Sequence, residues 1–137
     1  MTQEPPATQD PVAAPDRPID AHPAALPEGA TEVPPDRWSD WCARASQEGR
    51  GRPVSLHYAD VALGEVQLAQ GEPLVGIDHE ELGGTVALTI RYGDGVVPRR
   101  HVVAEPRRVL EEQDDSGRLV LLVIVDSTRR MTWVGLA

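Results

Sequence analysis

The chain has 137 residues, 22 of them acidic and 13 basic, which gives a net charge of −9; it contains no Lys, Asn or Phe. This length fits one domain plus a tail. The longest apolar run, Leu119 to Val125, is far shorter than the ~20 residues of a membrane span, so the composition excludes a transmembrane helix.

The first 35 residues differ in composition from the rest of the chain. Nine of the 13 prolines lie before residue 37, together with seven acidic residues and a single Arg, and no aromatic residue occurs there. Such a segment buries too little apolar surface to offset its chain entropy. We therefore expect residues 1–35 to form a disordered, acidic, proline-rich leader and residues 36–137 to form a single domain. The start also lacks the features of a secretory signal, so we expect a cytoplasmic protein.

One helix is expected directly after the leader. Trp38, Trp41, Cys42 and Ala45 have the i, i+3, i+4, i+7 spacing of one helical face, with Asp36 as the expected N-cap and Gly49 as the C-terminal stop. The two tryptophans are expected to pack into the hydrophobic core of the domain. Cys42 lies on the same stripe without an activating base, so we interpret it as a core residue and not a nucleophile.

From Gly51 onward the hydrophobic period changes to two. The segments "PVSLHYAD", "VALGEVQLAQ", "EPLVGID", "GGTVALTIRY", "RRHVVAEPRRVLEE" and "RLVLLVIVDSTRRMTWVGL" indicate six to eight short strands separated by Gly, Pro and Asp. No second helix is available for a parallel crossover. The predicted fold is therefore α+β but mostly β: one N-terminal helix capping a small antiparallel, partly closed sheet or barrel.

The run "LVLLVIV" is apolar on both faces of its strand. One face can line the core, but the other must also be covered. We favour the helix as that cover over a second subunit, which leaves both a monomer and a homodimer open. Trp41 and Leu122 are expected on the two sides of the contact between helix and sheet.

Four segments together resemble a family of small bacterial proteins classed as a domain of unknown function. They are the helix with Trp38, "LGEVQLAQGEPLVGIDHE", "HVVAEPRRV" with His101 followed by Pro106 and Val109, and "DDSGRLVLLVIVD". The resemblance covers about residues 37–136. The chain departs from the pattern in lacking a Tyr before Asp78 and in carrying the leader. The resemblance implies the domain boundary and transfers no catalytic role.

Motifs for catalysis and metal binding are weak in this chain. The candidates are His57, His79, His101 and the acidic residues of "DHEE", Asp78 to Glu81. Their spacing matches neither a helical His pair nor Cys/His pairs, and no phosphate loop or dinucleotide fingerprint occurs. We expect no metal and no cofactor. A small hydrolase that uses His101 or His79 as a base remains an alternative.

Two Arg pairs flank His101, and they define the candidate binding residues Arg99, Arg100, His101, Arg107 and Arg108. Adjacent strand residues face opposite ways, so neither pair can point at one ligand. We expect solvated or salt-bridged strand faces, with Glu105, Glu111, Glu112, Asp114 and Asp115 as the nearby partners. A polyanion site, shielded at low salt by the acidic leader, is the alternative.

We therefore expect a non-catalytic binding or interaction module. The net negative domain with few aromatics argues against a nucleic-acid partner, and its short apolar runs argue against a membrane. A protein partner remains open.

Overall fold

The computed structural model describes residues 29–60, 62 and 64–137. The leader predicted for residues 1–35 lies mostly outside this range, and the described chain reaches the sheet before residue 36 with a short strand, β2. In chain order the elements are β2 (Thr31–Val33), the 3-10 turn η1 (Pro35–Arg37), α2 (Trp38–Gly49), β3 (Pro53–Asp60), β4 (Gly64–Leu82), β5 (Thr85–Tyr92), β6 (Arg99–Ala104), β7 (Pro106–Gln113), β8 (Leu119–Asp126) and β9 (Met131–Leu136).

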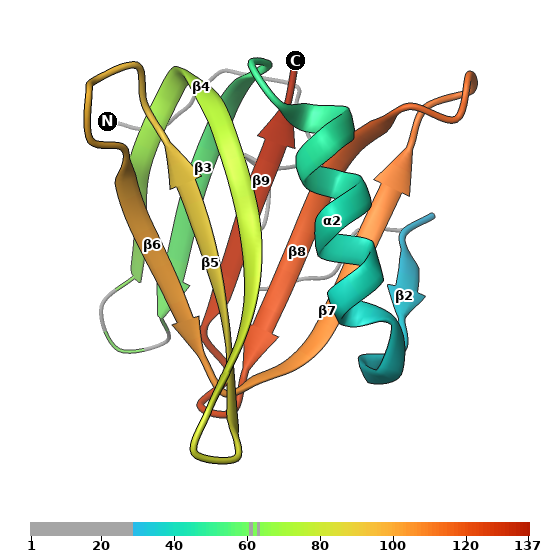
Figure 1. The fold of residues 1–137 in the computed structure, drawn as a ribbon, viewed down its shortest axis with the longest axis vertical. Coiled ribbons are helices and arrows are strands. Elements are labelled where there is room, and N and C mark those ends of the chain that lie inside the picture. The colour runs from blue at the N-terminus through green and yellow to red at the C-terminus, as the bar shows by residue number, and fades with distance from the viewer. Residues whose placement is uncertain (1–28, 61, 63) are drawn as a thin grey trace, which may run out of the picture.

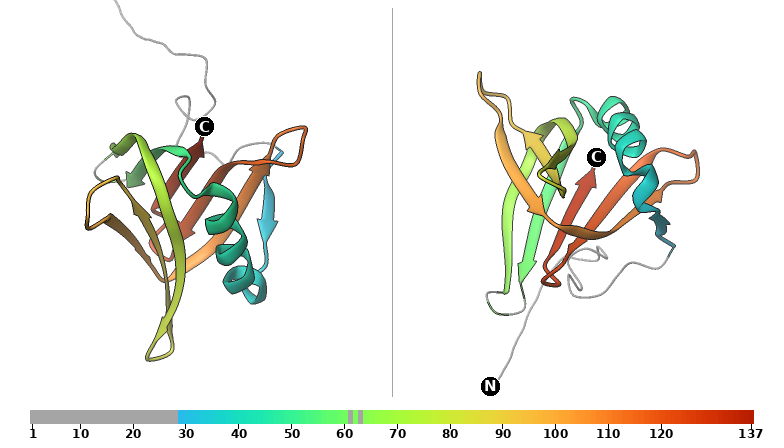
Figure 2. Two further views of the ribbon diagram at one scale, coloured as in Figure 1. Left: turned by 45° about the horizontal axis from the view of Figure 1, so that its top comes forward. Right: turned by 60° about the horizontal axis from the view of Figure 1, so that its bottom comes forward.

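The eight strands form one antiparallel sheet in the order β2-β7-β8-β9-β3-β4-β5-β6 (Figure 1). The predicted class is confirmed: the fold is mostly β, with one α-helix in the described part of the chain. That helix spans 12 residues, and none of the described helices is long and apolar enough to cross a membrane. The sheet is strongly curved but not closed into a barrel (Figure 2).

Strand β4 corrects the prediction of separate short strands at this point. It runs for 19 residues, and Gly71, expected to end a strand, lies inside it. Gly71 has φ +82, and the pairing with β3 shifts register there, between Val54 and Ser55. A glycine with positive φ lets a strand form a bulge and continue, so it bends β4 without ending it.

The bend makes β4 change partners along its length. Residues 64–73 pair with β3, and residues 74–82 pair with β5. The second half of β4 therefore has a free edge on the side away from β5, and α2 lies against this edge, between β4 and β7–β8 (Figure 1). Ser46 makes the connection: its Oγ accepts a hydrogen bond from Ile77 N (2.7 Å) and donates one to Ile77 O (2.9 Å).

At Glu105, between β6 and β7, the chain crosses between the two halves of the curved sheet. Glu105 has φ +51, a left-handed conformation that lets the chain turn from one half of the sheet to the other. Its N–H donates to Val86 O (3.1 Å), and its carbonyl accepts from Ser127 N (3.0 Å). These bonds tie β5 to the turn between β8 and β9.

The helix starts and ends differently from the prediction. Asp36 lies in the 3-10 turn η1, the N-cap position is Arg37, and the cap has no side-chain hydrogen bond. Gly49 is the last helical residue, and Gly51, with φ +82, lets the chain change direction after the helix. Gly49 is required for packing instead, because a Cβ there would lie 2.7 Å from Leu74 Cδ2.

The inner face of the sheet and the helix share one core. Trp38, Trp41, Cys42 and Ala45 pack there against aliphatic side chains of both halves of the sheet, among them Leu122. Trp41 is 2% exposed and Leu122 0%, which confirms both as core residues, and Cys42 is confirmed as a buried free thiol.

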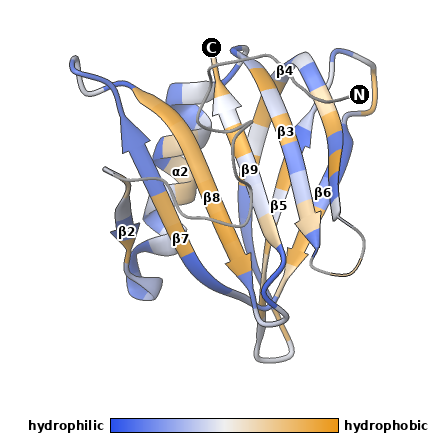
Figure 3. Cartoon of the chain, turned by 180° about the vertical axis from the view of Figure 1, so that it is seen from behind, coloured by the Kyte–Doolittle hydropathy of each residue, from blue (hydrophilic) through white to orange (hydrophobic). Residues whose placement is uncertain are grey.

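A second apolar cluster lies on the other face of the strands that follow Glu105. We call it the outer cluster; its members are Leu110, Leu121, Val123, Met131 and Trp133. Seen from behind in Figure 3, the most hydrophobic strand is β8. The helix does not cover this face, contrary to the expectation, because the curved sheet places α2 on the inner side together with β4–β6.

Candidate binding site

The first Arg pair is divided between the two sides of β6. The Arg99 guanidinium forms an ion pair with Glu72 and lies over the Tyr92 ring, with its Cζ 5.2 Å from the ring centroid. Arg100 is exposed, and its register partner on β5 is Arg91. The expectation that adjacent arginines would separate is confirmed for this pair.

In the second pair, one arginine forms an ion pair. Arg108 holds Glu32 of β2 in a two-point contact, with Nη2–Oε1 at 2.8 Å and Nε–Oε2 at 3.2 Å. These hydrogen bonds lower the pKa of Glu32 and raise that of Arg108. Arg107 is exposed, at a register shift between β7 and β8.

The ion-pair partners differ from those predicted. Glu72 and Glu32 are distant in sequence from Arg99 and Arg108, and the strand order of the sheet brings them together: β2 pairs with β7, and β4 lies one strand away from β6. Arg99 lies at the far end of β6 from Glu105, about 20 Å away at 3.3 Å per strand residue. The four arginines therefore do not converge on one position.

His101 points into the inner side of the sheet, where a hollow of about 290 Å³ opens between β6 and the β8–β9 turn. Its Nε2 lies 3.0 Å from Thr132 Oγ1, and the Tyr58 ring meets its ring edge-on, with centroids 5.3 Å apart and planes at 67°. Burial lowers the pKa of His101, which favours the neutral imidazole.

The polar groups around this hollow stabilise the β8–β9 turn that lines it. Thr132 is 1% exposed, so its hydroxyl cannot meet a substrate in this conformation. Ser127 Oγ donates to Glu105 Oε1 (3.0 Å), and Asp126 Oδ1 accepts from the backbone N–H groups of Thr128 and Arg130 (2.9 Å each). This geometry favours a structural role for the His101 segment.

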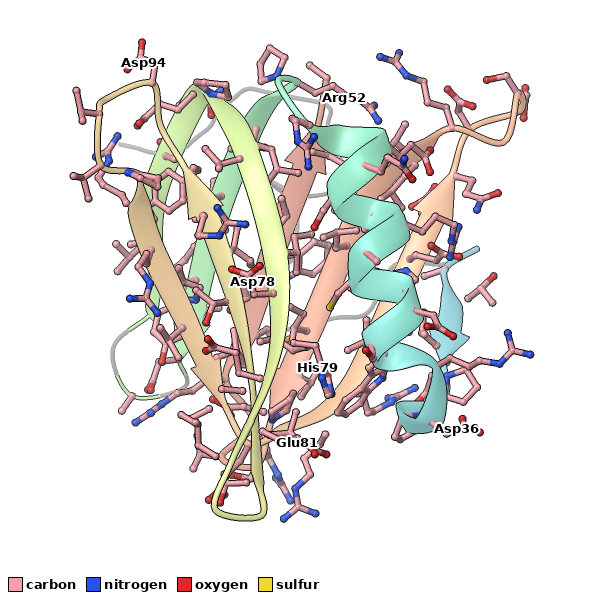
Figure 4. All side chains as sticks on the ribbon, in the orientation of Figure 1. Asp36, Arg52, Asp78, His79, Glu81 and Asp94 are labelled. Carbon is pink, nitrogen blue, oxygen red and sulfur yellow. The ribbon has the colours of Figure 1, made fainter. Side chains whose placement is uncertain are left out.

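The acidic "DHEE" segment lies in the second half of β4. Asp78 binds Arg91 through two oxygens, Oδ2–Nε at 2.6 Å and Oδ1–Nη2 at 3.1 Å. Figure 4 shows Asp78 and His79 projecting to different sides of the strand. Across residues 29–60, 62 and 64–137, no group of three or more His, Cys, Asp or Glu side chains is placed to hold a metal ion.

The same segment explains the "PLVGID" motif. A Cβ on Gly76 would lie 2.5 Å from Arg91 Nη2, so only glycine leaves room for the guanidinium that Asp78 holds. Leu74 packs on Gly49, and Ile77 lies in the inner core. The residues of this motif thus pack β4 against β5 and against the helix.

A hollow of about 450 Å³ lies beside the helix and β2. Its lining residues are Glu32, Val33, Pro34, Arg37, Asp40, Trp41, Arg44 and Glu111. Glu111 Oε1 accepts a hydrogen bond from Trp41 Nε1 (2.9 Å) and lies 3.6 Å from Arg44 Nη2. Acidic and basic side chains both line the hollow, and its polar groups already contact one another. The lining therefore favours no particular class of ligand.

The outer cluster is uniformly apolar, and its five side chains are buried, each only 1–6% exposed. In the register of the sheet Leu110 lies opposite Val123, and Val123 lies opposite Trp133. Two contacts between polar side chains flank the cluster: the ion pair Glu32–Arg108 on the β2 side, and His57 Nδ1, which lies 2.7 Å from Glu65 Oε2, on the β3–β4 side.

The sequence carried the signal for this surface in "LVLLVIV" and in the alternation of "MTWVGL". The interpretation of the site missed it, because the helix was expected to cover that face. Sequence alone does not tell on which side of a curved sheet a helix packs.

Comparison with known proteins adds one finding. The model of a family described as a family of unknown function (DUF5335) matches residues 30–136. Neither the curated proteins nor the solved structures gave a match. The match begins one residue before β2 and ends with β9, so it covers all the described strands.

Proposed function

We propose, for a chain that belongs to the DUF5335 family of unknown function, that the domain is a non-catalytic interaction module. Its binding surface is the outer cluster, and its ligand is an extended, apolar polypeptide segment. The observation that carries the proposal is the second apolar face on β7, β8 and β9, which lies opposite the helix.

The chemistry of the outer cluster supports an apolar ligand. Aliphatic, Met and Trp side chains on three adjacent strands gain about 25 cal/mol for each Å² of apolar surface that a ligand removes from water. The five side chains are each only 1–6% exposed, which shows that this apolar face is kept out of water. The polar side chains at the rim already contact each other, so they offer little to a charged ligand.

Polyanion binding through the Arg pairs is less well supported. Arg99 and Arg108 are each engaged by a carboxylate, and the length of β6 separates Arg99 from the second pair. A hydrolase based on His101 has weaker support as well, since the neighbouring hydroxyl of Thr132 is buried.

We further propose that the protein acts in the cytoplasm of a bacterium. The supporting observation is the single cysteine, Cys42, which is buried and free in the described domain. A lone thiol in a small β domain fits a reducing compartment better than one where small domains rely on disulfides.

Site-specific photo-crosslinking in the full chain tests the proposed surface. A photoreactive amino acid replaces Val125, a partly buried residue that packs at the edge of the outer cluster. The matched control replaces Val97, an 80% exposed valine in the β5–β6 loop. We expect the Val125 probe to crosslink to an apolar, extended polypeptide segment, identified by mass spectrometry, and the Val97 probe not to. Absence of a Val125 product, or the same products at both positions, would refute the proposal.

A further inference from the structure

We infer that Ser55 is a nucleophilic serine that accepts a short acyl group from an ester, with His57 as its base and Glu65 holding His57 in position. The three side chains lie on β3 and the first half of β4, next to β9 (Figure 3). The inference goes beyond the proposed function, because it assigns a site of covalent modification. It concerns one transfer to Ser55, which needs no turnover and so leaves the module non-catalytic.

The pairing of β3 with β4 brings the three side chains to one face of the sheet. Ser55 and His57 are two residues apart on β3, so they point the same way. Glu65 is the register partner of Ala59, the next residue of β3 on that face. Glu65 therefore reaches His57 diagonally across the two strands.

The contacts between these side chains follow the order nucleophile, base, carboxylate. Ser55 Oγ lies 3.0 Å from His57 Nε2, and His57 Nδ1 lies 2.7 Å from Glu65 Oε2. A carboxylate only accepts hydrogen bonds, so Nδ1 carries a proton, and in the neutral ring Nε2 is then the acceptor for the Ser55 hydroxyl. The His57 side chain is 12% exposed, so water competes little for these contacts. This is the arrangement that activates a serine for attack on a carbonyl carbon.

Gln70 is the other neighbour of the serine hydroxyl. Its Oε1 lies 3.1 Å from Ser55 Oγ and also accepts a hydrogen bond from Gln67 Nε2. An amide oxygen does not take up a proton near neutral pH, whereas an imidazole does. The proton that Ser55 loses therefore goes to His57, and Gln70 only holds the hydroxyl in place.

A hollow of about 260 Å³ opens beside Ser55. Val120 and Leu136 line it with aliphatic side chains, and none of the described residues around it has a charged side chain. Gly135 lies between Leu121 and Ser55 in the register of the sheet and leaves room there, because it has no side chain. The hollow therefore suits a short aliphatic acyl chain whose carbonyl lies at Ser55 Oγ.

Gly71 adds backbone to the same hollow. It is skipped in the register between β3 and β4, and the extra residue of such a bulge is left out of the ladder. Negative charge develops on the carbonyl oxygen during the attack and is stabilised by hydrogen-bond donors that the fold does not use. The bulge places a backbone segment of this kind at the hollow.

The transfer step balances without another reactant. Ser55 Oγ forms a bond to the acyl carbon while its proton moves to His57 Nε2, and the bond from that carbon to the alcohol oxygen of the ester breaks. The leaving oxygen takes the proton from His57. The products are acyl-Ser55 and the free alcohol. Glu65 offsets the positive charge of His57 while the ring holds the proton.

Labelling of the full chain with a fluorophosphonate compares the nucleophilicity of its serines. Peptide mapping should find Ser55 labelled at least about a hundredfold faster than Ser39, an exposed serine of α2 that serves as the internal control. His57→Gln should slow the labelling of Ser55 by about a hundredfold or more, because the base is lost. Equal labelling of Ser55 and Ser39, or an unchanged rate in His57→Gln, would overturn the inference.

Glu65 acts through His57, so its test reads out the ring itself. Glu65→Gln should slow the labelling of Ser55 and shift the NMR signal of the His57 Nδ1 proton, because that proton loses its carboxylate acceptor. Glu112→Gln on β7 is the matched control and should change neither. The midpoint of urea unfolding shows that each variant is folded. An unchanged Nδ1 signal in folded Glu65→Gln would overturn the positioning role of Glu65.

A chromogenic ester tests the transfer and separates it from the proposed function. Nitrophenyl butyrate should release a burst of one nitrophenolate per chain, and mass spectrometry should find butyryl on Ser55. Gly135→Val narrows the hollow and should suppress this burst more than the burst with nitrophenyl acetate. Absence of any release that Ser55→Ala removes would overturn the inference.

The two proposals fail in different ways. Continuous release that depends on Ser55 would support the nucleophile and overturn the non-catalytic part of the proposed function. A Val125 probe that finds no polypeptide segment would overturn the interaction module and leave the result at Ser55 standing.

Discussion

At the scale of single residues, the contact of Gly76, Arg91 and Asp78 shows how one small side chain fixes its neighbours. The guanidinium of Arg91 lies over the Cα of Gly76 and bonds to Asp78, and these hydrogen bonds raise the pKa of Arg91. The glycine is needed here because of close approach, not because of a positive φ.

We expect Gly76→Ala to destabilise the fold by about 0.5–1.5 kcal/mol, because the new Cβ displaces the guanidinium from Asp78. Urea denaturation measures the loss. Gly95→Ala is the matched control: its Cβ would lie 3.7 Å from the nearest atom, Val97 O, and it should change stability by less than about 0.5 kcal/mol. In an Arg91→Ala background the cost of Gly76→Ala should shrink; an unchanged cost would show that the guanidinium is not what the Cβ meets.

His101 predicts a pH dependence with a definite sign. Burial lowers its pKa below the ordinary 6.5, so as pH falls the unfolded chain takes up this proton before the folded chain does. His101 therefore contributes stability that is present above about pH 6.5 and is lost as pH falls toward the folded pKa. We expect His101→Gln to flatten this part of the stability profile between about pH 7 and pH 5, measured by urea denaturation at each pH. An NMR titration that places the His101 ring at or above its ordinary pKa would contradict the prediction.

At the scale of elements, the helix is attached to the sheet through a strand edge as well as through its apolar stripe. Ser46 satisfies both backbone groups of Ile77, on the half of β4 that has no strand beside it on that side. Near the last helical turn, Glu48 Oε2 accepts a hydrogen bond from Leu119 N (2.6 Å), which ties the helix to β8. Helix and strands thus share hydrogen bonds across the open side of the sheet.

We expect Ser46→Ala to cost about 1–3 kcal/mol, since it leaves the N–H and C=O of Ile77 partly buried without that partner. The matched control is Ser39→Ala on the exposed side of the same helix, which should stay within about 0.5 kcal/mol of wild type. The midpoint of urea unfolding measures both. Equal effects of the two substitutions would mean that the bond to Ile77 adds nothing to the attachment.

At the scale of the whole molecule, Cys42 reports on the integrity of the inner core. It is buried between helix and sheet, and burial, with a smaller contribution from the charge of Asp78, raises the pKa of its thiol to about 12 from 9.0. The thiolate is the reactive form, so the folded state protects Cys42 both by exclusion and by ionisation.

We expect a thiol reagent at about pH 8 to modify Cys42 in the folded chain at least about a thousandfold more slowly than in urea, from the three-unit rise in pKa alone. The rate should follow the fraction of unfolded protein as urea increases. Ser39→Cys in a Cys42→Ala background is the control and should react at once. Rapid labelling of Cys42 in native protein would show that the helix opens without global unfolding.

The sequence by itself determined the elements that depend on local pattern. The stripe of Trp38, Trp41, Cys42 and Ala45 predicted the helix and its buried face, and the period of two after Gly51 predicted an antiparallel, mostly β fold. The alternation of strand side chains also predicted that Arg99 and Arg100 would face opposite ways. These features follow from the geometry of a single helix or strand, and that geometry is determined by residues close together in sequence.

The tertiary structure alone decided how these elements meet. The continuation of β4 through Gly71, the helix on the inner side of the sheet and the ion pairs of Arg99 with Glu72 and Arg108 with Glu32 all join residues distant in sequence. A glycine in a strand pattern fits both a bulge and an end, and a run apolar on both faces does not tell which face the helix takes. The curvature of the sheet resolves both, because it arises from all eight strands together and leaves the outer cluster on the side away from the helix.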